Sequence, residues 1–232
     1  MEYCFMLSYL GDFLRGEIDF LEVIIYLGSI CFIIFCATPL HEFAHAFAAV
    51  KLGDDTPRLR GRLTINPMAH IDLIGALMIF LVGFGYAKPV EVRMRNFKKP
   101  KRDMALVALA GPVCNIIQAF ICLLLINTLR AFLPSTATLQ YICMFFLYAA
   151  VINVNLAVFN LIPIPPLDGS RLLTALLPSK YYYKLMQYER YFTIGLYVLM
   201  FTGILSVPLS LLSNLVINGL LFVTGLPFSF IG

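Results

Sequence analysis

Charged residues are scarce in this chain, in which Asp, Glu, Lys and Arg make up 13% of 232 residues and hydrophobic residues 60%. Soluble proteins carry about a quarter charged residues, so this composition excludes a sizeable soluble domain. No charged side chain occurs at 104–129 or from 191 to the C-terminus. Runs of this length can cross a hydrocarbon layer of about 30 Å. The composition therefore predicts an integral membrane protein.

The chain also lacks any C-x-x-C pair among its six cysteines, most of which lie in apolar runs, so we expect no disulfide framework. The net charge of +4 is concentrated in three basic segments, 51–70, 88–103 and 171–190. Such clusters fit the surface of a lipid bilayer and do not indicate nucleic acid as a partner. By the positive-inside rule all three segments are cytoplasmic.

The predicted fold class is a polytopic all-α membrane bundle. Spanning helices are expected at 23–52, 104–132 and 138–161, and further apolar segments at 191–206 and 209–223. We expect one membrane-embedded domain over residues 1–232. Its parts are an interfacial segment at 1–22, a catalytic core at 23–175 and C-terminal membrane segments at 176–232.

Two short stretches between the first two spans interrupt the helical pattern. Residues 58–65 and 90–95 alternate with period two, which predicts β-strands with an edge available to an extended substrate. Residues 71–87 are apolar but have basic flanks on both sides, so we expect them to enter the membrane and return. The prediction is a small strand and re-entrant insertion next to the active site.

Histidine is rare as well, and two of the three histidines lie in the motif His41-Glu42-Phe43-Ala44-His45. Glu42 is the only charged side chain between residues 23 and 50. Residues four apart share a helix face, so the two imidazoles can supply two corners of a zinc site. Glu42 can then take a proton from a metal-bound water. Paired structural histidines are the plain alternative, but an intramembrane carboxylate is costly and usually functional.

A zinc site of this kind needs a third protein ligand and an open position. Asp168 is the leading candidate, in the proline-rich stretch 160–169 that follows the third span. If residues 71–87 do not cross, His41, His45 and Asp168 all lie toward the cytoplasmic ends of their helices. A helix terminator followed by an Asp-Gly turn is the alternative interpretation.

Three motifs in this order resemble the site-2 protease family of intramembrane zinc metalloproteases. They are H-E-x-x-H, G-P-x-x-N at 111–115 and N-x-x-P-x-P-P-x-D-G at 160–169. Residues 61–70 are similar to the short bacterial and archaeal branch, which lacks a PDZ domain. That branch usually has D-P-I-G where this chain has Asp72-Leu73-Ile74-Gly75, a departure that touches no ligand.

The resemblance implies one zinc ion per chain, held by His41, His45 and Asp168, with Glu42 as the catalytic base. It also implies that Asn160 holds the scissile peptide or its oxyanion. Asn115 matches a family Asn near the site, with an interhelical hydrogen bond as the alternative role. His70 could be a gate, a transient zinc ligand or a plain loop residue.

The expected function is hydrolysis of peptide bonds in or near transmembrane segments of membrane proteins. The expected location is the cell membrane, with the active site toward the cytoplasmic side. Two alternatives are a non-catalytic relative that binds membrane segments and a metal transporter that uses the same ligands in transit. The sequence specifies neither the substrate's identity nor the oligomeric state.

Overall fold

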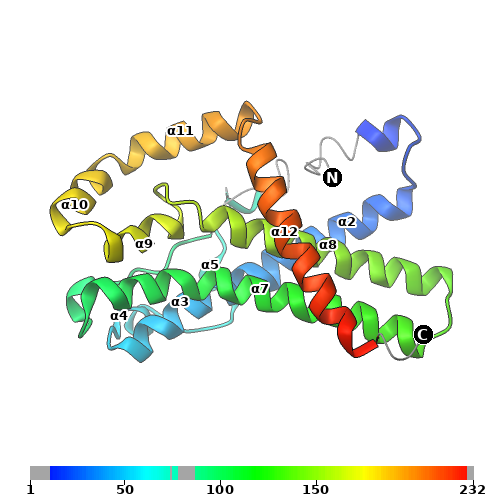
Figure 1. Cartoon of the computed structure of the whole chain (residues 1–232), viewed down its shortest axis with the longest axis horizontal. Coiled ribbons are helices and arrows are strands. Elements are labelled where there is room, and N and C mark those ends of the chain that lie inside the picture. The colour runs from blue at the N-terminus through cyan, green and yellow to red at the C-terminus, as the bar shows by residue number, and fades with distance from the viewer. Residues whose placement is uncertain (1–10, 74, 78–86, 229–232) are drawn as a thin grey trace.

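A computed structural model describes residues 11–73, 75–77 and 87–228 of the chain (Figure 1). Four of its helical segments are long and apolar enough to cross a membrane: Phe20–Leu52, Pro100–Phe132, Ala137–Asn160 and Ser206–Phe228. The first three coincide, to within a few residues, with the predicted spans. The protein is therefore a multi-pass helical membrane protein.

The first span changes its helical pitch just before the histidine pair. It consists of α2 (Phe20–Phe32), a π-helical turn (Ile33–Ala37) and α3 (Thr38–Leu52). Pro39 has no N–H to donate and its ring clashes with the carbonyl four residues earlier, so the preceding turn widens. Gly53 ends α3 as its C-cap in the left-handed conformation, with φ 111°.

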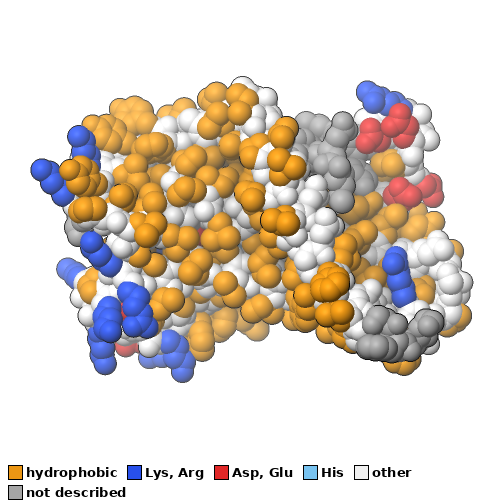
Figure 2. Space-filling model, in the orientation of Figure 1, with side chains coloured by type: hydrophobic (Ala, Val, Ile, Leu, Met, Phe, Trp, Pro, Cys, Tyr) orange, Lys and Arg blue, Asp and Glu red, His pale blue; other side chains and the backbone are white. Residues whose placement is uncertain are grey.

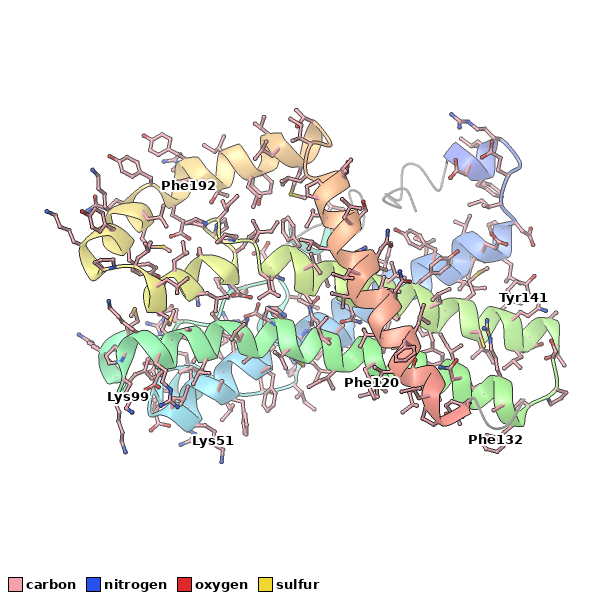
Figure 3. All side chains as sticks on the ribbon, viewed as in Figure 1. Lys51, Lys99, Phe120, Phe132, Tyr141 and Phe192 are labelled. Atoms are coloured by element: carbon pink, nitrogen blue, oxygen red, sulfur yellow. The ribbon has the colours of Figure 1, made fainter. Side chains whose placement is uncertain are left out.

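The next two spans form an antiparallel hairpin of α7 (Pro100–Phe132) and α8 (Ala137–Asn160). The buried side chains between them and α12 form the largest apolar core of the described chain. Figure 3 shows Lys51 and Lys99 at one end of the bundle, with Phe132 and Tyr141 at the other. The end of α3, the start of α7 and the end of α8 therefore lie toward the same side.

In the described part of the chain four α-helices follow, α9 (Asp168–Leu176), α10 (Ser179–Gln187), α11 (Glu189–Phe201) and α12 (Ser206–Gly225), and then a 3₁₀ turn (Leu226–Phe228). Figure 1 shows α9, α10 and α11 turning back beside the hairpin, and α12 crossing it obliquely. The 13 residues of α11 reach about 20 Å, less than the bilayer core. Of the two predicted C-terminal apolar segments, only the second is long enough to span.

The predicted β-strands are wrong, because the described residues contain no strand. The first stretch instead begins in the one-turn helix α4 (Thr56–Leu59), turns at Gly61 with φ 68°, and ends just before the one-turn helix α5 (Pro67–His70). Local turns use its backbone donors, as in the Arg62 N–H bond to the Pro57 carbonyl of 2.8 Å. A left-handed residue and locally bonded amides prevent a ladder from forming.

The second stretch ends in a 3₁₀ turn (Met94–Asn96) and is held by a side chain. The Arg93 N–H donates to Oδ2 of Asp54 at 2.7 Å instead of to a neighbouring strand. The proposed strand edge for an extended substrate therefore has no support. Part of the predicted re-entrant stretch, residues 74 and 78–86, lies outside the described residues.

Charge is segregated along the long axis of the molecule. In Figure 2, most Lys and Arg side chains gather at the end where α10 and the start of α7 lie, while hydrophobic side chains cover most of the face between the ends. A long apolar face next to a cationic end is the pattern expected of a protein in a bilayer.

Candidate metal centre and catalytic cavity

Two helices bring the three predicted ligands together. His41 and His45 lie one turn apart on α3, and Asp168 is the first residue of α9. Oδ2 of Asp168 lies 3.2 Å from Nε2 of His41 and 3.0 Å from Nε2 of His45, and the two Nε2 atoms are 3.1 Å apart. One oxygen and two nitrogens thus form a nearly equilateral triangle across more than a hundred residues of sequence.

The spacing and chemistry of these three atoms fit a zinc ion. Zinc bonds to His nitrogen and carboxylate oxygen are about 2.0–2.1 Å long, which places two ligand atoms of a tetrahedral site about 3.3 Å apart. The observed separations of 3.0–3.2 Å approach this value. Within the described chain these residues are the one group of three or more His, Cys, Asp or Glu close enough to share an ion. Two imidazoles and a carboxylate leave a fourth position open.

A backbone contact from α7 orients the second imidazole. Nδ1 of His45 donates to the carbonyl oxygen of Val107 at 2.7 Å, so its Nε2 carries the free lone pair. Nδ1 of His41 is buried and has no hydrogen-bond partner among the described residues. The Val107 contact is the kind of outer-shell bond that fixes a metal-binding histidine.

Gly111 allows α7 to approach this imidazole pair. A Cβ atom at Gly111 would lie 2.3 Å from Nε2 of His45 and 2.6 Å from Nε2 of His41. No side chain can occupy that space without moving a ring. The glycine of the G-P-x-x-N motif therefore makes room for the metal centre.

Gly169 has the same function for the carboxylate. A Cβ atom there would lie 2.3 Å from the carbonyl oxygen of Leu161 and 2.4 Å from that of Ile162. These backbone atoms belong to the turn after α8, which folds back against the start of α9. The absent side chain lets this turn place Asp168 beside the imidazoles.

The environment of Asp168 favours its charged form. Burial acts to raise the pKa of this carboxyl, but the neighbouring His45 and His41 rings outweigh burial and hold that pKa below the ordinary aspartate range. An ionised carboxylate is the form that binds a metal ion.

A cavity of about 440 Å³ opens beside the three ligands, and Glu42, Asn115 and Asn160 also line it. Glu42 is 9% exposed, and no described residue hydrogen-bonds to its carboxylate. Its oxygens are therefore free to accept a proton from water in the cavity. The sequence-predicted residues other than His70 thus surround one space.

The two asparagines differ in how their amides are used. Nδ2 of Asn160 donates to the Leu156 carbonyl at 3.0 Å. Asn115 is almost completely buried, and its Nδ2 has no partner among the described residues, while its Oδ1 accepts from Gln118 at 3.4 Å. Asn115 therefore lines the cavity, but its unsatisfied Nδ2 atom is itself buried.

His70 lies elsewhere. It is fully buried at the end of α5, and its Nε2 donates to the carbonyl of Thr64 at 2.8 Å. It does not line the cavity. This placement favours the loop-residue interpretation over a gate or a zinc ligand.

Sequence reasoning missed several residues around the site. Arg171, Thr193 and Tyr197 line the cavity, and the buried Asp54 organises the loop between α3 and α7. The carboxylate of Asp54 accepts from Thr56, Arg93 and Asn96. Only Asp54 had a usable signal, because an Asp directly after a C-cap glycine and two residues before Thr-Pro is typical of an Asx turn.

Comparison with known proteins decides the family. The chain is 42% identical over 165 residues to "Putative zinc metalloprotease YwhC" of Bacillus subtilis, and the match covers 70% of this chain and 75% of that protein. The chain belongs to peptidase family M50. The family profile itself matches residues 129–205 of this M50 member, a range that contains Asn160 and Asp168. The resemblance to site-2 proteases is thereby confirmed.

Other M50 relatives align less completely. "Putative zinc metalloprotease Rip2" of Mycolicibacterium smegmatis is 34% identical over 168 residues, which are 70% of this chain and 57% of the relative. The protein of the same name from Mycobacterium tuberculosis is 37% identical over 134 residues, 56% of this chain and 50% of the relative. No solved structure matches this M50 chain.

Proposed function

We propose that this M50 protein is an intramembrane zinc metalloprotease that hydrolyses peptide bonds in or near transmembrane segments of membrane proteins. The observation that carries the proposal is the convergence of His41, His45 and Asp168 beside Glu42 in one cavity. Both imidazoles and Glu42 lie on a helix long and apolar enough to span a bilayer. Polar groups at that depth usually serve a function.

His41, His45 and Asp168 would hold one zinc ion per chain. When bound, zinc supplies a Lewis acid that polarises a substrate carbonyl and lowers the pKa of water to near 7. The Val107 carbonyl keeps His45 in the orientation that this ligand set requires. Gly111 and Gly169 keep side chains out of the space that the ligands occupy.

Glu42 acts as the general base and acid in this scheme. Its carboxylate takes the proton of the attacking water and returns it to the amine that leaves when the peptide bond breaks. Asn160 and Asn115 face the same cavity and are suited to hold the scissile peptide, or the oxyanion that forms on its carbonyl. The hydrogen bond of Asn115 with a described residue comes from Gln118 of the same helix, so it gives no support to the interhelical alternative.

The basic end of the bundle supports a cytoplasmic location for the site. His41 and His45 lie in the half of the first span nearer Lys51, and basic loops favour the cytoplasmic side of a cell membrane. The partners of this scheme are a transmembrane protein substrate and the lipid bilayer. The membrane-embedded domain would comprise the whole chain, with 23–175 as its catalytic core.

A metal transporter is less well supported. Ion transit requires several ligand clusters along a path, whereas the described residues hold one such group. The intact set of ligands and base also argues against a relative that only binds membrane segments.

The test is cleavage of a model single-span protein in vesicles by wild type, Glu42→Gln and Glu22→Gln. Glu22 lies at the start of the same span and does not line the cavity, so it controls for the charge change. We expect Glu42→Gln to retain one zinc per chain and to lose activity at least about a hundredfold. Equal cleavage by wild type and Glu42→Gln would refute the protease mechanism.

A further inference from the structure

Arg171 is the one basic side chain among the described residues that line the catalytic cavity. It lies on α9, three residues after Asp168, and is half-buried. Residues three apart share a helix face, so Arg171 lies on the same side of α9 as the carboxylate ligand. The rise between them along the helix axis is about 4.5 Å.

The guanidinium of Arg171 has no partner in the described chain. No carboxylate lies within ion-pair distance of it, although other basic side chains such as Arg58 and Arg60 do have acidic partners. Its backbone carbonyl accepts from Thr174, but its side chain makes no hydrogen bond with described residues. Arginine carries five donors and is a common binder of carboxylates. An unpaired, half-buried arginine in a cavity is therefore available to a ligand.

The balance of charges in the cavity indicates that a ligand of Arg171 carries a negative charge. Glu42 and Asp168 are the only carboxylates that line it among the described residues, and together they match the two charges of a zinc ion. Arg171 then leaves one positive charge unbalanced. The residues of α11 that line the cavity, Thr193 and Tyr197, carry neutral hydroxyl groups that do not alter this balance.

We propose that Arg171 forms a carboxylate-binding subsite that selects substrates with Asp or Glu close to the scissile bond. An extended peptide advances about 3.3 Å per residue, so the acidic residue lies one to three positions from that bond. The inference rests on the proposed proteolytic function and names its substrate class. A substrate's acidic side chain would form a charge-assisted, two-pronged hydrogen bond with the guanidinium.

Binding is measured first, on the non-cleaving Glu42→Gln protein. Single-span peptides that differ only in Glu, Gln or Lys at each of the six positions around the cleavage site are titrated in vesicles. At one position we expect the Glu peptide to bind about tenfold more tightly than the Gln peptide, because a hydrogen bond to a charged group contributes a free energy of this size. The Lys peptide should bind more weakly than the Gln peptide. Charge reversal in Arg171→Glu should invert that order, so that Lys is preferred.

Arg190→Glu is the matched control, because Arg190 is exposed at the start of α11 and does not line the cavity. It should keep the wild-type preference for Glu. If Arg171→Glu fails to fold, as judged by zinc content, Arg171→Gln should abolish the preference without inverting it. Cleavage rates in the Glu42-containing protein should follow the same order.

Equal affinity for Glu, Gln and Lys peptides at every position, or an unchanged order in Arg171→Glu, would overturn the subsite. That result differs from a failure of the proposed function. If the wild-type protein cleaves the peptides in a Glu42-dependent way but at rates that do not depend on their charge, the protease function is supported and the Arg171 subsite is refuted. If the protein bound a cleaved peptide with a free carboxyl terminus more tightly than an uncleaved peptide with an internal Glu, that result would also contradict the proposal that Arg171 selects substrates.

Discussion

Two regions of the molecule, helix α7 and the pair α10 and α11, differ in how many of their residues are buried, although α7 and α11 both line the catalytic cavity. Helix α7, which packs against the metal ligands, has eleven buried residues. Helices α10 and α11 together bury two among their described side chains, Tyr182 and Leu196. Tyr191, Ile194 and Val198 of α11 are more than half exposed.

The difference assigns separate tasks to the two regions. The ligand triangle depends on close contacts from α7 and α9, where a single Cβ atom would collide with an imidazole or a carbonyl. Thr193 and Tyr197 reach the cavity from α11, whose other face is weakly packed. Changes around α7 should therefore affect metal binding and folding, and changes on α11 should affect the substrate.

The largest effect is expected for Gly111→Ala, compared with Gly195→Ala on α11. The added methyl group at Gly111 would collide with His45, whereas a Cβ at Gly195 meets nothing within 4 Å. Because the ring must move, we expect zinc affinity to fall at least about tenfold and activity with it. Metal analysis of the purified variants measures this change. Full zinc content in Gly111→Ala would contradict the proposed role of the close helix contact.

A smaller effect is expected for Asp54→Asn, with its neighbour Asp55→Asn as control. Asp54 is fully buried and accepts hydrogen bonds from Thr56, Arg93 and Asn96. Loss of its charge should lower stability by about 2–3 kcal/mol and the thermal midpoint by about 5–10 °C. Asp55 forms an exposed pair with Arg58, so its change should have almost no effect. Equal midpoints for the two variants would show that the Asp54 contacts are not stabilising.

The effect of Asp54 should also depend on pH with a known sign. Burial acts to raise the pKa of this carboxyl, but hydrogen bonds from Arg93, Thr56 and Asn96 lower it below the ordinary value. A group whose pKa is lowered on folding stabilises the protein above its unfolded pKa, near 3.9. The stability difference between wild type and Asp54→Asn should therefore be constant near neutral pH and shrink below about pH 4. A difference that grows on acidification would contradict this account.

The smallest effect is expected for Tyr197→Phe, which removes a hydroxyl from the α11 wall of the cavity. No described residue hydrogen-bonds to that hydroxyl, so we expect KM to rise about two- to tenfold through a lost contact with substrate. Zinc content and thermal stability should stay at wild-type values. Tyr188→Phe, which changes a tyrosine outside this cavity, serves as the control. Loss of zinc in Tyr197→Phe would show that the two regions are not separate.

The sequence could single out the three residues that the structure brings together because each had an independent signal. His41 and His45 share a helix face by their spacing, and Glu42 is conspicuous in an uncharged span. Asp168 was a candidate because the predicted number of membrane crossings places it on the same side of the membrane as the two histidines. That argument requires no side-chain detail. Arg171 entered only as one of several basic residues, because nothing in its local sequence shows which surface it faces.

The sequence failed where backbone hydrogen bonds decide the structure. Alternation at 58–65 and 90–95 describes side chains, but it does not reveal that Arg93 donates its N–H to the distant Asp54. The left-handed Gly61 likewise converts an apparent strand into a turn. The sequence does not specify the π-helical turn before α3, because a proline such as Pro39 disturbs a helix without determining how the chain adjusts.

The central claim is that His41, His45 and Asp168 bind one zinc ion together. X-ray absorption at the zinc edge of the purified protein tests it most directly, with Asp168→Ala for comparison. We predict one zinc per chain with two imidazole nitrogens and carboxylate or water oxygens at about 2.0–2.1 Å, and loss of zinc in Asp168→Ala. A sulfur ligand near 2.3 Å, or an unchanged spectrum in Asp168→Ala, would contradict the account.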